Sequence, residues 1–199
     1  MKEKELFVFV EKYRPHKIED IVLPQKVKKQ LKGILKEQDF TNLLFYGNAG
    51  CGKTSAAKAL CEELNREYMF INGTNCGVDT ARYTFPQFAS SLSLECNNRK
   101  VIIIDEAEKM SDSFSQAFNS FIEEYADNCA FILTTNYPNQ LSSAIRSRFN
   151  DISFDVSTKE EKKEMFINFL ERCYSILDKE EIQYDKKIVP KFVVEYFPD

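Results

Sequence analysis

Short apolar runs alternate with helical patterns between residues 25 and 154. The runs have the length of strands, and they lie at 43–46, 67–71, 101–104 and 130–134, while Asp151-Ile-Ser-Phe154 fits a fifth strand. Around them, apolar residues recur at helical spacing over 25–37, 53–65, 79–94 and 112–125. The run 101–104 contains only Val and Ile, which is typical of a strand buried on both faces of a parallel sheet. The alternation therefore predicts an α/β fold with a doubly wound, parallel five-stranded sheet.

The strand signals stop at Ser157. Ser157 and Glu160 fit a capping box, and apolar residues follow at helical spacing at Met165, Phe166, Phe169, Leu170 and Cys173. The rest of the chain is charged and helical in pattern, apart from an apolar run at 192–194 that also fits a strand. We therefore expect an α/β domain over 1–155 and a small, incomplete helical domain over 156–199.

Composition excludes several classes of function. The net charge of −4 does not indicate a nucleic-acid-binding protein, so any DNA contact needs a local basic surface. No apolar run approaches membrane-spanning length and the N-terminus lacks a signal-peptide pattern, so we expect a cytoplasmic protein without membrane contact. The six cysteines are scattered without a C-x-x-C pair, and there is one histidine. These counts argue against zinc, a disulfide framework and a histidine-based triad.

The segment 47–54 carries the strongest chemical signal. It reads Gly-Asn-Ala-Gly-Cys-Gly-Lys-Thr, which fits G-x-x-x-x-G-K-[ST] between a strand and a helix. Glycine lets the backbone wrap so that its N–H groups face a phosphate, and the helix start adds partial positive charge. Lys53 can reach the terminal phosphates, while the Thr54 hydroxyl can hold Mg²⁺. The predicted nucleotide contacts in this phosphate loop are Gly47, Asn48, Ala49, Gly50, Cys51, Gly52, Lys53, Thr54 and Ser55.

Two carboxylates follow the apolar run 101–104, and the carboxyl ends of parallel strands form the edge where ligands bind in such sheets. Asp105 can support the Mg²⁺ held by Thr54, and Glu106 can orient or deprotonate an attacking water. We expect Glu108 and Lys109 to be solvated. Together with the phosphate loop, the acidic pair predicts a nucleoside-triphosphate hydrolase.

Further polar residues follow the fourth strand. Asn136 supplies an uncharged amide that can hydrogen-bond a γ-phosphate or the attacking water. Arg146 and Arg148 precede the last strand, and arginine stabilises phosphoryl charge in the transition state. Spacing leaves open whether either arginine reaches the nucleotide of its own chain or that of a neighbour. Near the N-terminus, Tyr13 and Arg14 fit either an adenine pocket or a tethered arm.

In sequence and order, these segments resemble the AAA+ subunits of sliding-clamp loaders. The matching segments are Glu11-Lys-Tyr-Arg-Pro15, the phosphate loop, Asp105-Glu-Ala-Glu108, Thr134-Thr-Asn136 and Ser147-Arg148. Within that family the chain most resembles the large ATPase subunit of T-even-type phages. The resemblance implies an AAA+ P-loop NTPase with a helical lid and with ATP and Mg²⁺ as cofactors. It also implies that ATP binding and hydrolysis drive the opening and loading of a ring-shaped clamp at primer–template DNA during replication.

The family resemblance further implies partners and residue roles. The partners are neighbouring subunits of a hetero-pentamer, the sliding clamp and primer–template DNA, in the host cytoplasm if a phage encodes the chain. Arg148 would act in trans on a neighbour's ATP, Asn136 would be a sensor residue, and Tyr13, Arg14 and Pro15 would contact the nucleotide. Gly77-Val-Asp-Thr-Ala-Arg82 resembles a DNA-facing segment, which assigns DNA contacts to Val78 and Arg82. The family's collar domain would follow residue 199.

Alternative functions share parts of this pattern. Another AAA+ ATPase on DNA, such as a helicase loader, an initiator or a branch-migration motor, would share the phosphate loop and the acidic pair. Asp105-Glu-Ala-Glu108 also fits a DEAD/DEAH-type helicase, but 199 residues leave no room for a second RecA-like domain. A non-catalytic ATP-binding scaffold would not need both Lys53 and Glu106.

Overall fold

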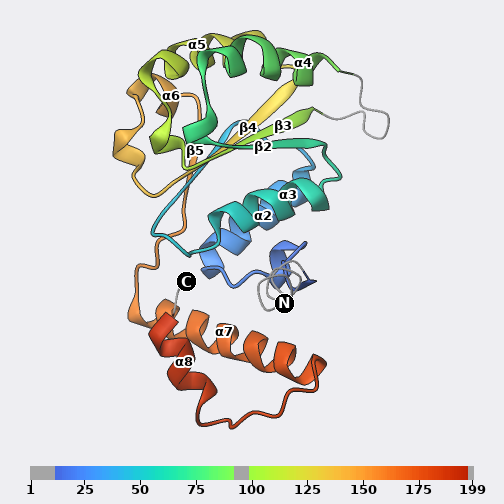
Figure 1. Ribbon diagram of the computed structural model, residues 1–199, viewed down its shortest axis with the longest axis vertical. Helices are drawn as coiled ribbons and strands as arrows, with labels where there is room; N and C mark the ends of the chain where they lie inside the picture. The colour runs from blue at the N-terminus through green and yellow to red at the C-terminus, as the bar shows by residue number, and fades with distance from the viewer. Residues whose placement is uncertain (1–11, 92–98, 197–199) are drawn as a thin grey trace, which may run out of the picture.

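The computed structural model describes residues 12–91 and 99–196, and its centre is one parallel sheet (Figure 1). The strand order is β2-β3-β4-β1-β5. The strands are β1 (Leu43–Tyr46), β2 (Tyr68–Asn72), β3 (Lys100–Asp105), β4 (Cys129–Thr135) and β5 (Asn150–Ser153). The predicted doubly wound, five-stranded parallel sheet is confirmed, with strand bounds close to those expected from the apolar runs.

Helices cover both faces of the sheet (Figure 1). One face carries α2 (Gln25–Glu37) and α3 (Lys53–Glu63), and the other carries α4 (Phe85–Ser90), α5 (Asp112–Glu124) and α6 (Ser143–Arg146). Successive strand residues alternate between two apolar clusters, so that Phe45 and Ile103 pack on the α2–α3 side while Leu44 and Ile104 pack on the other. Burial on both faces explains why β1, β3 and β4 are mostly hydrophobic instead of alternating.

Short helical turns fill the loops between strands and helices. A turn of 3-10 helix, η1 (Ile18–Asp20), precedes α2, and η2 (Gly73–Asn75), η4 (Ala107–Lys109) and η5 (Pro138–Gln140) follow β2, β3 and β4. The last three therefore stand at the carboxyl edge of the sheet, which is where the phosphate loop begins after β1. Polar side chains from four strand ends are brought to this edge.

The helix expected over 79–94 is interrupted. Its first part is a π-helical turn, η3 (Thr80–Thr84), the α-helix α4 spans only Phe85–Ser90, and the backbone is extended at Ser91. Pro86 explains the irregular start, because proline lacks the N–H that would bond back to the preceding turn. Phe85 is buried as expected, whereas Leu92 lies outside the described residues.

Two helices follow the sheet, α7 (Lys159–Lys179) and α8 (Val189–Tyr196). The capping box forms one residue later than expected, between Thr158 and Glu161, because the sequence Ser-Thr-Lys-Glu-Glu fits the pattern in two registers. The apolar run 192–194 is helical and not a strand, and Val193 is its buried member. A short apolar run cannot be distinguished from a helix segment by periodicity alone. The domain division at residues 155 and 156 stays a prediction.

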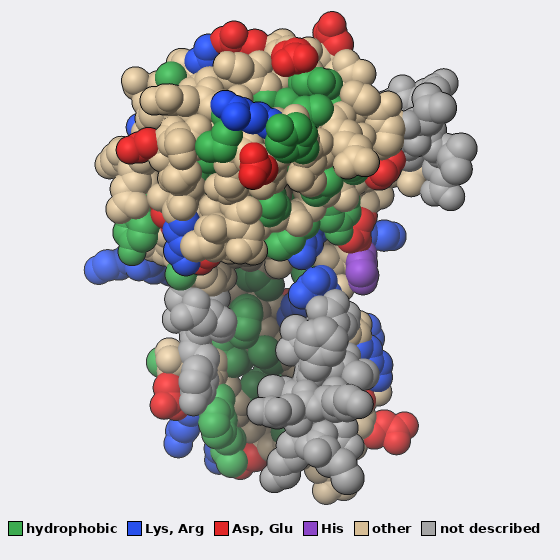
Figure 2. All heavy atoms as spheres, turned by 45° about the horizontal axis from the view of Figure 1, so that its top comes forward, with side chains coloured by type: hydrophobic (Ala, Val, Ile, Leu, Met, Phe, Trp, Pro, Cys, Tyr) green, Lys and Arg blue, Asp and Glu red, His purple; other side chains and the backbone are tan. Residues whose placement is uncertain are grey.

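The helix α7 packs beneath the N-terminal segment. Arg172 donates through its guanidinium to the backbone oxygens of Asp20 and Tyr13, and Gln25 donates to Glu164 at 2.8 Å. The space-filling view shows the molecule narrowing between the sheet with its helices and α7–α8, with hydrophobic side chains visible in the recess (Figure 2). Within the described ranges, no helix has the length and apolarity that a membrane span requires.

Candidate nucleotide-binding site

A cavity of about 330 Å³ opens at the carboxyl edge of the sheet, above the N-terminus of α3. It is lined by Ala49, Gly50, Gly52, Lys53, Thr54, Ser55, Asp105, Glu106, Thr134, Thr135 and Asn136. The structure thus brings together most of the phosphate loop, both predicted carboxylates and the predicted amide. Thr134 and Thr135 line the cavity although we did not predict a contact for either.

The phosphate loop has the backbone that its glycines predict. Gly47, Gly50 and Gly52 all have positive φ, and α3 begins directly after Gly52. Lys53 is 8% exposed, and its Nζ donates to Gly47 O at 2.9 Å, Asn48 O at 2.7 Å and Asn136 Oδ1 at 2.7 Å. These acceptors are all uncharged. None of them is a carboxylate that would offset the positive side chain beside the cavity, which favours an anionic ligand.

Thr54 and Asp105 meet on the opposite wall. The Thr54 hydroxyl donates to Asp105 Oδ1 at 2.7 Å, and the Thr134 hydroxyl donates to the same oxygen. A hydroxyl and a carboxylate beside a phosphate site match the oxygen ligands that Mg²⁺ prefers, since it is commonly held by one or two carboxylates together with substrate phosphates. The donor set fits the predicted Mg²⁺.

Glu106 is held from two sides. Its Oε2 accepts from Asn72 Nδ2 at 2.8 Å and from Lys109 Nζ at 2.8 Å, and its backbone is left-handed with φ 53°. The hydrogen bond from Asn72 and then the contact with Lys109 lower the pKa of Glu106 below its ordinary value. The carboxylate is therefore charged at neutral pH, and Glu106 lines the cavity.

One of two expectations at this edge is wrong. Lys109 is exposed as expected, although it pairs with Glu106, whereas Glu108 is partly buried. One Glu108 oxygen accepts from the Asn136 N–H at 3.4 Å, and the other is buried without a hydrogen-bond partner. Glu108 turns inward because η4 folds the chain back toward the strand ends. Asn72 is a further residue that sequence reasoning missed, although its position opposite Asp105 in the β2–β3 register brings it to the same edge.

The two arginines lie elsewhere. Arg148, just after α6, donates to Ala144 O at 2.6 Å and pairs with Glu123 on α5. Arg146 donates to Asp151 at 3.2 Å. Neither guanidinium lines the phosphate cavity, so the structure does not bring the predicted catalytic arginine to the nucleotide site of its own chain.

A second cavity, of about 170 Å³, adjoins the phosphate loop on the side of α7. It is lined by Pro15, Asp20, Ile21, Val22, Gly50, Gly52, Met165, Phe169 and Arg172. Of the three predicted N-terminal contacts, Pro15 lines this cavity, whereas Tyr13 and Arg14 do not. The Tyr13 hydroxyl hydrogen-bonds Glu180 instead, at the far end of α7.

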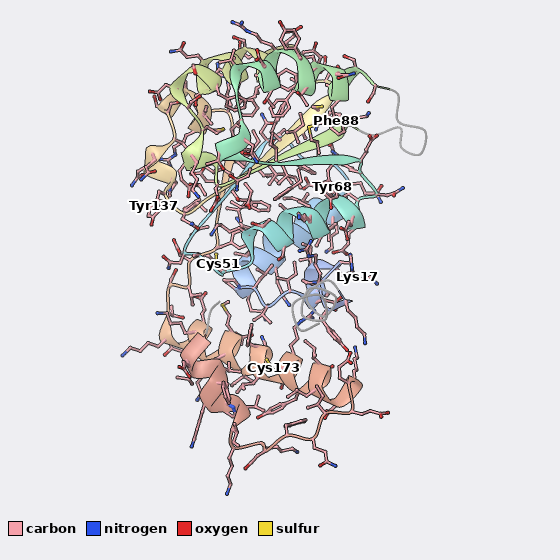
Figure 3. The ribbon with its side chains drawn as sticks, viewed as in Figure 1. Lys17, Cys51, Tyr68, Phe88, Tyr137 and Cys173 are labelled. Atoms are coloured by element: carbon pink, nitrogen blue, oxygen red, sulfur yellow. The ribbon has the colours of Figure 1, made fainter. Side chains whose placement is uncertain are left out.

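Cys51 lies beneath the loop and not in either cavity. Its Sγ is 3.6 Å from Lys53 Nζ, and burial raises the pKa of the thiol. Figure 3 shows Cys51 and Cys173 of α7 on the two sides of the space between the sheet and the lower helices. The side chain of Cys51 therefore supports the loop from below, while the backbone of its neighbours faces the cavity.

The predicted DNA contacts form a separate group. Val78 is partly buried and Arg82 is exposed, both near the π-helical turn η3. Gly77 precedes them, and its N–H bonds the Thr80 hydroxyl at 3.3 Å. Neither Val78 nor Arg82 lines the phosphate cavity.

Comparison with known proteins agrees with this geometry. Residues 43–156 match the model of the ATPase family associated with various cellular activities (AAA). The chain is 34% identical to the sliding-clamp-loader large subunit of Escherichia phage RB69 over 96% of its length, and 36% identical to that of Enterobacteria phage T4 over 99%. It is 32% identical to the replication factor C small subunit of Aeropyrum pernix over 90% of its length.

Solved structures show the same fold. The RuvB Holliday junction branch migration motor of Thermotoga maritima superposes with a TM-score of 0.65 at 25% identity, covering 83% of this chain and 55% of that one. The chain spans about three fifths of the two phage proteins, 61% and 62% of their lengths. Because the family model covers the whole sheet and both halves of the phosphate cavity, the chain belongs to the AAA family of ATPases.

Proposed function

We propose that this chain is an ATPase subunit of a sliding-clamp loader, which couples ATP binding and hydrolysis to opening and loading a clamp on primer–template DNA. The observation that carries the proposal is similarity along 96% and 99% of the chain to two proteins named as sliding-clamp-loader large subunits. The phosphate cavity adds the chemistry, because it joins a lysine, a hydroxyl, two carboxylates and an amide.

ATP fits across the two adjoining cavities. Its phosphates would lie against the loop, where Gly52, Lys53 and Thr54 meet the start of α3. Its base would occupy the smaller cavity, whose walls are Pro15, the segment after it and the apolar side of α7. Tyr13 and Arg14 would support this wall from outside the cavity. There the Tyr13 hydroxyl bonds Glu180, and the Tyr13 carbonyl oxygen accepts from Arg172 of α7.

Thr54 and Asp105 would hold Mg²⁺, Thr54 directly and Asp105 as its carboxylate support. When bound, Mg²⁺ neutralises charge on the β- and γ-phosphates. The structure supports this assignment because the two oxygens are already 2.7 Å apart at the loop end of β3. Ser55, one residue further along α3, lines the same cavity.

Glu106 would act as the base that orients or deprotonates the attacking water. Asn72 and Lys109 both bond its Oε2 and would compete with water for that oxygen, so the attacking water would be oriented through Oε1 or after these contacts break. Asn136 would sense the γ-phosphate, since its amide oxygen already accepts from the Lys53 ammonium. Arrival of the phosphates would release the Lys53–Asn136 hydrogen bond and the contacts that hold Glu106.

Arg148 would complete the site of a neighbouring subunit. Its guanidinium is 31% exposed and lies outside its own cavity, which supports a role in trans. An arginine that acts between subunits requires an assembly, and the proposed partners are other subunits of a hetero-pentamer, the clamp and primer–template DNA. Val78 and Arg82 would contact DNA phosphates through a helix start and a guanidinium, which position DNA without reading sequence.

A branch-migration motor is the second candidate. The similarity to RuvB favours it, but that match covers 83% of the chain at 25% identity, whereas the clamp-loader matches cover nearly all of it at higher identity. The deciding experiment measures ATP turnover of the full subunit with its partner subunits, with and without primed DNA and a clamp. Turnover that rises only when both DNA and clamp are present supports a clamp loader. Stimulation by four-way junctions without any clamp would contradict it.

A further inference from the structure

The connector between β5 and α7 crosses the start of the phosphate loop. Phe154 is fully buried and extends the β1–β5 pairing, with its N–H 2.8 Å from Tyr46 O. The next residue, Asp155, passes so close to Gly47 that a Cβ there would lie 3.1 Å from Asp155 Oδ1 and 3.2 Å from its backbone nitrogen. Gly47 also has φ 147°, so both space and backbone angle require glycine at this crossing.

One peptide group of the loop is held between opposite charges. The Gly47 carbonyl accepts from the Lys53 ammonium at 2.9 Å, and the N–H of the same peptide bond, on Asn48, donates to Asp155 Oδ1 at 3.1 Å. Because the C=O and N–H of a trans peptide point in opposite directions, Asp155 and Lys53 pull on its two ends. Hydrogen bonds to charged groups are stronger than neutral ones, so this peptide has a firmly set orientation.

The orientation of this peptide sets the resting place of Lys53. The ammonium uses the carbonyls of Gly47 and Asn48 as acceptors. The Asp155 carboxylate fixes the orientation of the peptide group that links these two residues. A loop that turned at this peptide would move the lysine and the backbone N–H groups that follow. Asp155 therefore acts on the phosphate site through the loop backbone, without lining the cavity.

Asp155 also lies just before α7, the first helix of the predicted lid. Three residues separate it from α7, which begins at Lys159 and lines the smaller cavity with Met165 and Phe169. The opposite wall of that cavity is the same phosphate loop, at Gly50 and Gly52. The loop and α7 are thus related in two ways. They line opposite walls of the smaller cavity, and the connector that leads into α7 bonds the loop through Asp155.

We infer that Asp155 is a positioning residue that couples the position of α7 to the shape of the phosphate loop, and so sets the affinity for nucleoside triphosphate. The inference rests on the proposed ATP site. A shift of α7 moves the connector, the connector moves the Asp155 carboxylate, and the Gly47–Asn48 peptide follows. Conversely, a loop ordered by phosphates holds the carboxylate and so fixes α7 over the base.

The test compares three variants of the full subunit. In Asp155→Ala, the acceptor is lost, and we expect KM and Kd for ATP to rise about tenfold with kcat unchanged, a factor that corresponds to about 1.4 kcal/mol. In Asp155→Asn, the amide oxygen can still accept from Asn48, so both constants are expected within about threefold of wild type, roughly the loss for a weaker neutral hydrogen bond. Asp151→Ala, four residues earlier on β5 and paired with Arg146 outside the cavity, is the matched control and should bind ATP normally.

Hydrogen exchange in α7 separates coupling from a local defect. In wild type and in Asp155→Asn, ATP should slow exchange across 159–179, whereas in Asp155→Ala saturating ATP should leave it fast. If Asp155→Ala does not fold, Asp155→Ser replaces it, because its shorter side chain cannot reach Asn48. Wild-type affinity and wild-type lid protection in the alanine variant would overturn the inference, as would an asparagine variant as weak as alanine. Failure of the wild type to bind ATP at all would instead refute the proposed function.

Discussion

Lys53 and Arg148 are both cations that we expect to act on ATP phosphates, yet they differ in exposure, in partners and in position relative to the phosphate cavity. Lys53 is 8% exposed, touches only uncharged acceptors and faces the cavity. Arg148 is 31% exposed, pairs with Glu123 and lies outside that cavity. The loop therefore supplies its own lysine, whereas the arginine is presented outward. The difference agrees with the proposal that one chain carries two complementary half-sites, and it teaches that the lysine and the arginine cannot serve the same cavity of one chain in this arrangement.

The difference has a simple origin in the sheet. The loop after β1 and the ends of β3 and β4 converge at the carboxyl edge, so their polar residues meet without help from another chain. Arg148 precedes β5, and its side chain turns toward α5 on one face of the sheet. The predictions below test these two half-sites from the largest expected effect to the smallest.

Replacing Glu106 tests the half-site that the loop builds. In Glu106→Gln, we expect ATP turnover by the full assembly to fall about 10³-fold, because an amide cannot take a proton from water. Nucleotide binding should persist, since the side chain keeps its shape. Steady-state turnover and fluorescent-nucleotide binding measure the two effects. Glu124→Gln, on the exposed side of α5, is the control, and unchanged turnover in Glu106→Gln would remove the assignment.

Replacing Arg148 tests the outward half-site. In Arg148→Ala, turnover of the assembly should fall by about 10²-fold, as for loss of one preorganised donor in the transition state. Affinity of the same chain for ATP should not change, because the guanidinium lies outside its cavity.

Mixed assemblies decide whether Arg148 acts in trans. Subunits carrying Arg148→Ala should regain turnover when they are mixed with Lys53→Ala subunits, which keep the arginine but cannot use ATP. Arg146→Ala, two residues away and paired with Asp151, is the matched comparison and should lose less than Arg148→Ala. If no mixture regains turnover, the two half-sites do not complete each other.

Arg82 tests whether DNA contacts lie apart from both half-sites. In Arg82→Ala, DNA-stimulated turnover should fall about fivefold at raised salt while basal turnover stays the same, because one phosphate contact and its counterion release are lost. The slope of log affinity for DNA against log salt should shrink by about one. Lys187→Ala, exposed between α7 and α8, is the control. Equal losses of basal and stimulated turnover would contradict a DNA role.

The opposite edge of the sheet provides a test that should leave nucleotide chemistry untouched. Asp39 lies before β1 and accepts from Arg66 at 2.7 Å and Arg99 at 2.8 Å. Burial raises the pKa of Asp39, but hydrogen bonds from Arg99 and Arg66 outweigh it and lower the value from 3.8 to about 2. Because the folded pKa is below the unfolded one, the stabilisation is present above about pH 4 and is lost as pH falls toward 2.

Asp39→Asn should therefore lower the melting temperature at pH 6, and the gap from wild type should close as pH falls through this range. The carboxylate is 60% exposed, so solvent screening keeps the expected change to a few degrees. Thermal melting between pH 2 and 7 measures it, and ATP affinity at pH 7 should equal that of wild type. A gap that widens toward low pH would show that the arginines do not hold Asp39.

Local patterns predicted the sheet and the core of the phosphate site. Strands β1, β3 and β4 are mostly apolar runs, and the phosphate loop is a contiguous motif whose glycines impose its backbone, so neither depends on distant residues. Asp105 and Glu106 were predictable for the same reason, because they directly follow a buried strand. The capping box was displaced by one residue, since neighbouring hydroxyls and carboxylates fit the same pattern in two registers.

Contacts between segments could not be predicted in this way. The pairing of Glu106 with Asn72 depends on the β2–β3 register, and the inward turn of Glu108 depends on how η4 folds. Tyr13 reaches Glu180 and not the smaller cavity because α7 packs beneath the N-terminal segment.

The sequence by itself determined the sheet, the phosphate loop and the acidic pair, because each is encoded by neighbouring residues with strong local constraints. Only the tertiary structure decided where the cations point. It placed Lys53 inside the cavity and Arg148 outside it, and it brought Asp155 against a loop more than a hundred residues earlier. Such placements follow from strand order and close packing, which no single segment carries.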